Sequence, residues 1–395
     1  MLALRLVRGA RPWTLLRRLS VACAIAVAGF LLLSALGYGL AHPRDSGDAS
    51  VRLLWCLVPL AAAAQFAAAV ARTETPPRQP SALDTAGVGA ARLPLLAAGS
   101  TAVTGAFGSA LALLVFLQLR GGSGRLPFDG AAADVLGGDR PLPAAAVLTL
   151  LCLTPAVAAG ASALAVRSRA RTGSRTTEAA RAAAMSGLPW GAALTATGIT
   201  VVALARRSAP VKGGDAALLP LPGTVDGSPP AVLGGWLLAA VGLVLAGPGL
   251  AHLCGRLISL GRPGALRLLS GRVLQQEAVR VGRPLGVLCA VASGALAAAE
   301  LYGTAPDGGA RAFGPLTALG AALVVCCATA SALTAATACR AERAPVTATL
   351  LRLGAPRGLL RGAAALRGAV LLAVLAPVTW GVGVLAALPL HQAVG

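Results

Sequence analysis

The sequence predicts an all-α, polytopic transmembrane helical bundle with about nine spans. Hydrophobic residues make up 56% of the 395 residues, and charged residues make up only 12%. Several runs of about 20 residues carry almost no charge, and a helix of that length crosses a hydrocarbon core of about 30 Å. A soluble globular domain holds about 25% charged residues, so this composition argues against one.

Nine apolar segments are assigned as spans. The first run is too long for the core of a signal peptide and lacks a small-x-small cleavage site, so we expect an uncleaved anchor. The last run is long enough to cross once and too short to cross twice, which places the C-terminus outside unless two spans are merged elsewhere. Nine and ten spans therefore both stay open. The segments are residues 19–40, 51–71, 93–119, 142–166, 188–205, 231–254, 285–301, 315–338 and about 363–388.

Basic residues orient the predicted spans. Twenty-five arginines fall in segments on the side of the N-terminus, and eight basic residues fall on the other side. Since Lys and Arg accumulate in cytoplasmic loops, the N-terminus is expected in the cytoplasm. Arginine outnumbers lysine 33 to 1, which indicates the codon bias of a GC-rich bacterial genome. For a bacterial chain with this many apolar spans, the expected location is the bacterial cytoplasmic (cell) membrane.

The net charge of +20 is interpreted as a collar of arginines near anionic headgroups. A nucleic-acid surface is the rival interpretation, but neither a soluble domain nor aromatic interleaving supports it, so no nucleic acid is expected as a partner. The lipid bilayer is the expected environment.

The chain is not expected to be an enzyme or to bind a cofactor. A P-loop needs Lys followed by Ser or Thr, whereas the only lysine, Lys212, precedes Gly213. The three histidines are isolated, and the cysteines lie in or at the ends of apolar runs, so no metal site is predicted. Glu300 is the one acid within a run, and its position near the outer end favours an interfacial carboxylate over an ion-coupling site.

Two parts of the chain follow the same order of features. The only two tyrosines, Tyr38 and Tyr302, each precede a glycine at the outer end of an apolar run. A second apolar run and a short Arg-x-Glu motif follow, which is Arg72-Thr73-Glu74 in the first copy and Arg340-Ala341-Glu342 in the second. Six spans separate the copies, so they are predicted to be parallel repeats about an axis along the membrane normal.

A short loop element follows the second motif. Residues 347–353 are predicted to form a short helix that Gly354 ends in a left-handed cap and that Pro356 prevents from continuing. Leu350, Leu351 and Leu353 surround Arg352 there, and exposed leucines on a short stiff helix indicate a partner surface. The matching segment of the first copy is residues 83–88, with Leu83 and Gly87.

These loops resemble those of the FtsX-like permeases, membrane subunits of ABC transporters of the MacB and BceB type. The typical loop of that family reads Arg-x-x-Glu or similar, then Leu-Arg-x-Leu-Gly-Ala, and then a long helix. The resemblance covers residues 51–166 and 315–388, roughly half of the chain. The residues that carry it are Glu342, Leu350, Arg352, Leu353 and Gly354 in the second copy and Glu74, Leu83 and Gly87 in a decayed first copy.

The resemblance implies a domain order and a partner. It implies an N-terminal transmembrane helix (1–50), a first repeat core (51–166), a connecting transmembrane hairpin (167–260), a cytosolic segment with the leading helix of repeat two (261–314), and a second repeat core (315–395). In such proteins the short cytosolic helix docks on a separately encoded ABC ATPase subunit. The coupling loops would then contain Arg72, Glu74, Leu83, Gly87, Arg340, Glu342, Leu350, Arg352, Leu353 and Gly354.

One departure from the family narrows this expectation. Family members commonly carry a large extracytoplasmic domain after the first helix of a repeat, whereas the loops after Leu40 and Leu301 here hold about ten residues each. Capture of a periplasmic cargo is therefore not expected, and the expected cargo is hydrophobic or amphipathic. The direction of transport, and whether the chain works alone or as a homodimer, stay open.

Two alternatives to the permease remain. A mechanotransmitting signalling subunit, which moves an extracytoplasmic partner without transport, fits the same loops. A secondary transporter is less favoured, because ion coupling needs polar groups near the midplane and few are present.

Overall fold

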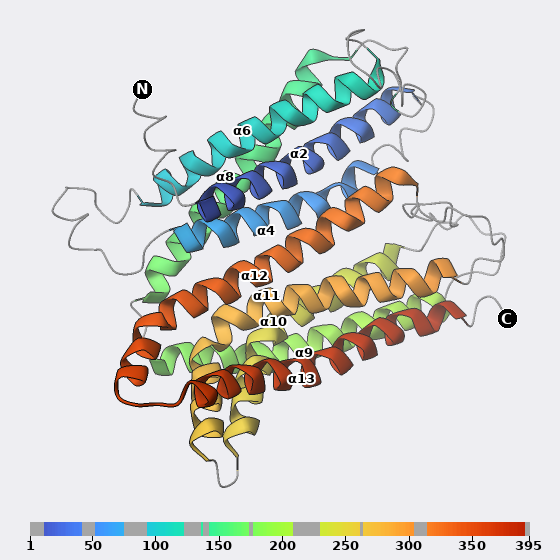
Figure 1. Ribbon diagram of the computed structural model, residues 1–395. Coiled ribbons are helices and arrows are strands. Elements are labelled where there is room, and N and C mark those ends of the chain that lie inside the picture. The colour runs from blue at the N-terminus through green and yellow to red at the C-terminus, as the bar shows by residue number, and fades with distance from the viewer. Residues whose placement is uncertain are drawn as a thin grey trace, which may run out of the picture. The chain divides into compact units, whose positions relative to one another are not determined.

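The computed structural model describes residues 12–41, 52–74, 93–121, 136, 142–173, 177–207, 230–260, 264–303 and 314–391. All regular secondary structure in these ranges is helical (Figure 1). Nine helices in them are long and apolar enough to cross a membrane. The prediction of an all-α, multi-pass membrane protein is confirmed. The helices are α2 (Pro12–Ala41), α4 (Leu57–Glu74), α6 (Leu93–Arg120), α8 (Ala144–Gly173), α9 (Thr177–Arg207), α10 (Pro230–Ser259), α11 (Ala265–Gly303), α12 (Pro315–Arg352) and α13 (Arg357–His391).

Two helices are much longer than the apolar runs from which they were predicted. Helix α11 has 39 residues and α12 has 38, where the apolar runs covered 285–301 and 315–338. At 1.5 Å per residue α11 is about 58 Å long, roughly twice a hydrocarbon core. The added residues are rich in Leu, Arg, Gln, Glu and Ala, which are good helix formers, so the helix continues where the apolar run ends.

The chain forms two compact units, and α12 contributes to both. Unit 1 consists of Met1–Gly173 and Phe313–Ser331, and unit 2 consists of Ser174–Ala312 and Ala332–Gly395. The first turns of α12 therefore pack in unit 1, and its last turns belong to unit 2.

Unit 1 is built around α2. Val21, Ile25 and Leu31 of α2 are buried and pack with Phe66 of α4 and Leu323 of α12 in one hydrophobic core. A second cluster joins α2 to α6 and α8. In it the rings of Phe30 and Phe116 pack edge to face, with their centroids 6.3 Å apart. Apolar burial and dispersion contacts thus hold the helices of this unit to one another.

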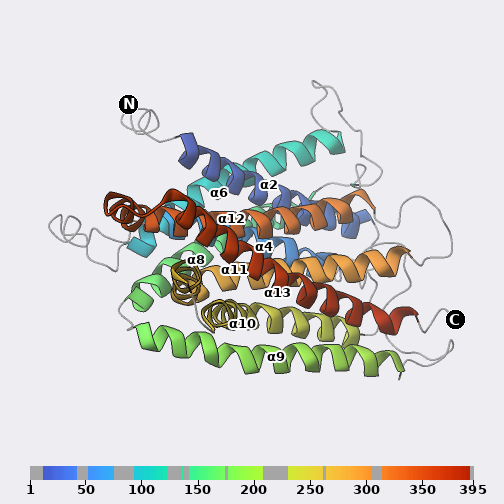
Figure 2. The same ribbon diagram turned by 60° about the horizontal axis from the view of Figure 1, so that its bottom comes forward.

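Unit 2 contains α9, α10, α11 and α13, with α10 between α9 and α11 (Figures 1 and 2). Glycines line both faces of α10. On one face of α10, a methyl group on Gly235 would lie 2.7 Å from the carbonyl oxygen of Gly198 in α9. On the other face, a methyl group on Gly282 of α11 would lie 2.7 Å from the carbonyl oxygen of Gly247 in α10. Small residues let helix backbones approach closely in a membrane, which explains the tight packing of these three helices.

Candidate functional site

The first Arg-x-Glu motif forms the last turn of α4, and it is bonded to the start of α2. Arg18 donates to both carboxylate oxygens of Glu74, from Nε at 3.2 Å and from Nη2 at 3.1 Å. Beside it, Nη1 of Arg17 donates to Oγ1 of Thr73 at 3.2 Å. The side chain of Arg72 is exposed. Two neighbouring arginines of α2 therefore hold the end of α4 through its last two residues.

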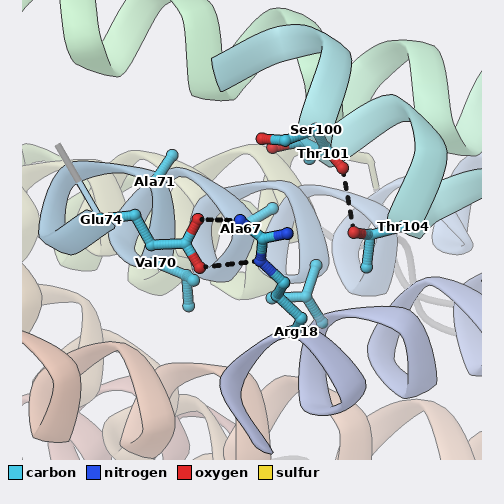
Figure 3. Close-up of a pocket in the computed structure, with 9 residues that line it drawn as sticks. Arg18, Ala67, Val70, Ala71, Glu74, Ser100, Thr101 and Thr104 are labelled. Atoms are coloured by element: carbon cyan, nitrogen blue, oxygen red, sulfur yellow. Dashed lines mark hydrogen bonds and ion pairs between the residues drawn. The ribbon is translucent and has the colours of Figure 1, made fainter. Parts of the chain in front are cut away.

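A small cavity opens beside this ion pair (Figure 3). Arg18 and Glu74 stand at one side of it, and three hydroxyl side chains of α6 stand at another: Ser100, Thr101 and Thr104. Ser100 and Thr104 donate to carbonyl oxygens of the preceding turn of α6, at 3.0 and 2.9 Å. The cavity thus combines a cation, a carboxylate and hydroxyl oxygens where α2, α4 and α6 meet.

The second Arg-x-Glu motif lies inside α12, about three turns before the end of that helix. Glu342 forms an ion pair with Arg280 of α11. The next residue, Arg343, forms a second ion pair with Glu277, one turn earlier in α11. In this pair Nε of Arg343 donates to Oε1 of Glu277, and Nη2 lies against Oε2. Arg340 is exposed. Two adjacent ion pairs of opposite polarity therefore join α12 to α11.

The two motifs share one relationship that the sequence analysis missed. In each, the glutamate binds an arginine of the long helix that precedes it along the chain: Arg18 of α2 for Glu74, and Arg280 of α11 for Glu342. The arginines lie 20 residues before Tyr38 and 22 residues before Tyr302. The sequence does contain an indication of this pairing, because α2 and α11 both carry arginines just before their apolar run.

The end of α12 confirms the predicted glycine cap. Gly354 has φ +89°, its N–H donates to the carbonyl oxygen of Leu351 at 3.1 Å, and the N–H of Ala355 donates to that of Leu350 at 3.0 Å. These two bonds make a Schellman motif. Residues 347–353 are not a separate short helix, however. They continue α12 past Pro345, which removes one backbone donor, and α12 bends in this region (Figure 1).

The leucines of this terminal segment differ in exposure. Leu353 is 79% exposed and Leu351 is 37% exposed, whereas Leu350 is half-buried. We call residues 346–354 the foot, because they form the capped end of α12 with apolar side chains turned outward. The matching residues of the first copy, Leu83 and Gly87, lie outside the described residues.

A buried hydroxyl network between α6 and α8 was also missed. Oγ1 of Thr101 donates to Oγ of Ser162 at 3.2 Å, and Ser109 and Thr154 share a hydrogen bond of 2.9 Å. Both helices place these residues eight positions apart, so one antiparallel register pairs them all. That matched spacing was the signal in the sequence.

Within the described ranges, no group of His, Cys, Asp and Glu side chains has the arrangement of a metal site. The side chain of Glu300 lies outside the described residues. Comparison with protein-family models, curated proteins and solved structures finds no match. The resemblance to FtsX-like permeases stays a prediction based on the loop motifs.

Proposed function

We propose that this chain is the membrane permease subunit of an ABC-type transporter, driven by a separately encoded ATPase. The observation that carries the proposal is the repeated ion pair between the glutamate of each Arg-x-Glu motif and an arginine of the preceding long helix. In unit 1 this pair ties the end of α4 to the start of α2, and in unit 2 it joins α12, about three turns before its end, to the first half of α11. A load applied at either motif would therefore act on two helices together.

The foot is the part proposed to meet the ATPase. Its Schellman end fixes the direction of the last turn, and Leu353 presents an apolar side chain that nothing covers in unit 2. Because Glu342 and Arg343 join α12 to α11 just before the foot, a push on the foot would move both helices. The excess of arginine on the predicted inner side supports a cytoplasmic position for this end, where ATP is found.

The proposed architecture is a pair of parallel repeats, in which α2 and α4 correspond to α11 and α12. The shared ion pair and the shared order of tyrosine, apolar run and Arg-x-Glu motif support it. Each repeat would then offer one docking element to one nucleotide-binding subunit. The proposed cargo is hydrophobic or amphipathic, since the helices expose mostly apolar side chains and the predicted outer loops after Leu40 and Leu301 are short.

Leu353→Asp tests the docking element. Its side chain is exposed, so the change should leave the fold intact while it opposes an apolar contact. We expect the ATPase subunit to co-purify with the unchanged chain and to be lost with Leu353→Asp, whereas Leu353→Met keeps it. A stronger variant combines Leu350→Asp with Glu342→Arg, which also breaks the pair with Arg280. If the ATPase still binds and is still stimulated after both changes, the foot is not the docking site.

The length of α11 favours a second candidate, a signalling subunit that moves an extracytoplasmic partner. A single helix of 39 residues, ion-paired to α12 within its first half, can transmit a displacement across the membrane without a transport path. Vesicles that contain the chain and its ATPase distinguish the two candidates. ATP-dependent movement of an amphipathic solute supports the permease, and its absence despite stimulated ATP hydrolysis supports the signalling subunit. A secondary transporter would need no ATPase at all.

A further inference from the structure

A groove lies between α10, α11 and α13 in unit 2, away from the ion pairs described above. Four apolar side chains form most of its lining, Leu257 and Ile258 from α10 and Leu366 and Val370 from α13. Arg267, in the first turn of α11, completes the lining. About 350 Å³ between these side chains is not filled by protein atoms, and part of that space is open to the surroundings.

Close helix contacts beside the groove fix its shape. Oγ of Ser270 donates to the carbonyl oxygen of Ala363 at 3.3 Å, and a methyl group on Gly362 would lie 2.9 Å from Cδ1 of Leu266. Small residues of α13 thus let the first turns of α11 approach it closely. The walls of the groove are therefore regular helices in direct contact with one another.

The chemistry of the groove matches an amphiphile with a negative head. Four of its five lining side chains are apolar, and Leu257 is 54% exposed, so this surface can contact an acyl chain. Arg267 is exposed, and no ion pair joins it to a carboxylate in the part of the chain that the structure describes. A guanidinium presents several N–H donors in one plane, and phosphate oxygens accept them in pairs.

We propose that this groove binds an anionic glycerophospholipid from the adjoining leaflet, with an acyl chain along Leu257 and Leu366 and the phosphodiester on Arg267. The position of the groove agrees with this, because Leu257 lies just past the apolar run 231–254 and Leu366 lies just inside the start of the run at about 363–388. The groove is therefore at the edge of the predicted hydrocarbon region, where headgroups lie. A zwitterionic lipid has no net charge for Arg267 to attract, and a free phosphate cannot use the apolar walls. The proposal depends on the membrane location and on unit 2 alone, so it stands whether or not an ATPase binds the foot.

The test measures lipid retained by the purified full-length chain in detergent, with phosphatidylglycerol, phosphatidylcholine and glycerol phosphate as probes. We expect phosphatidylglycerol to bind in preference to both others. Arg267→Gln should weaken its binding roughly ten-fold, the loss expected for one charge-assisted hydrogen-bonding group. Arg272→Gln is the matched control, because Arg272 is also exposed on α11 but does not line the groove.

A second variant tests the apolar part of the site. Leu257→Trp should fill the groove and lower phosphatidylglycerol binding while Arg267 is kept, and thermal unfolding of both variants should match that of the unchanged chain. Equal losses with Arg272→Gln and Arg267→Gln would overturn the proposal, because they would indicate a general collar of arginines. Glycerol phosphate binding as tightly as the lipid, or phosphatidylcholine binding equally well, would overturn it too.

Discussion

Arg18 on α2 donates two parallel hydrogen bonds to the carboxylate of Glu74 at the end of α4, from Nε at 3.2 Å and from Nη2 at 3.1 Å. A bidentate arginine–carboxylate pair fixes the relative orientation of its partners as well as their distance. The side chains of Arg18 and Glu74 are 52% and 24% exposed, so water screens the attraction between their charges. Its main effect is therefore to orient the two helix ends.

Glu74→Gln should lower ATPase stimulation far more than it lowers the stability of the fold. Because the pair is partly exposed, we expect the free energy of unfolding to fall by less than about 1 kcal/mol. The stimulated ATP hydrolysis of the proposed complex should fall much further, since the end of α4 loses its fixed position against α2. Thermal unfolding in detergent and ATPase assays on the reconstituted complex measure the two effects.

The exchanged pair, Arg18→Glu with Glu74→Arg, is the control for this prediction. It keeps opposite charges at the same two positions, so it should recover part of the lost stimulation. A double variant as poor as the single ones would show that the pair itself does not transmit the movement.

The pair between Arg343 and Glu277 should behave differently, because it is less exposed. The side chain of Glu277 is only 14% exposed. Arg343→Met would remove the ion-pair partner of this mostly buried carboxylate, and we expect a loss of about 3 kcal/mol in the free energy of unfolding. Denaturant titration in mixed micelles measures it.

The double variant Arg343→Met with Glu277→Leu removes both charges of this pair. Since an apolar pair can replace a buried ion pair at little cost, we expect it to be more stable than Arg343→Met alone. A loss below about 0.5 kcal/mol in Arg343→Met would instead assign the pair to the class of surface salt bridges.

The apolar runs of the sequence predicted the fold class and the positions of the helices. Each predicted apolar run overlaps one helix that is able to span a membrane, and the run 93–119 differs from the span Pro94–Arg120 by one residue at either end. This works because a lipid-exposed backbone must satisfy its hydrogen bonds within the segment, so a long apolar run has to be helical. The same logic does not locate the ends of α11 and α12, whose charged turns remain helical beyond the apolar run.

The contacts between helices were not predictable in the same way. The sequence marks Glu74 and Glu342 as notable, but their partners lie 56 and 62 residues away and are each one of many arginines. The cap at Gly354 was predictable, since its bonds join residues within one turn. The glycine cap was thus predicted correctly, the separate short helix over residues 347–353 was wrong, and the long-range pairing was missed.

Gly235 should tolerate no larger side chain, unlike its neighbour Gly234. A methyl group on Gly235 would meet the carbonyl oxygen of Gly198 and Cγ2 of Val202 at 2.7 Å each, whereas one on Gly234 would meet nothing within 4 Å. We expect Gly235→Ala to separate α9 from α10 and to lower the free energy of unfolding by about 1–3 kcal/mol. Gly234→Ala should leave it unchanged or raise it slightly. Equal thermal stability of the two variants would contradict the close approach of these helices.

Gly354→Ala tests whether the cap at the end of α12 serves the foot. With φ +89°, Gly354 adopts a conformation that costs an L-residue about 1 kcal/mol, and the space around it is open, so no clash adds to that cost. The strain falls on the last residue of the foot and not on the core. We therefore expect a small loss of thermal stability together with a several-fold loss of ATPase stimulation.

Gly358→Ala is the matched control for the cap. Gly358 also has open space around it, but it lies in the first turn of α13 without a positive φ, so alanine should fit there without strain. It should keep both stability and stimulation. Asparagine tolerates the left-handed conformation better than alanine, so Gly354→Asn should fall between the unchanged chain and Gly354→Ala. If stimulation instead followed side-chain size at residue 354, with asparagine the poorest, steric contact at the docking surface would explain the effect and the strain account would be wrong.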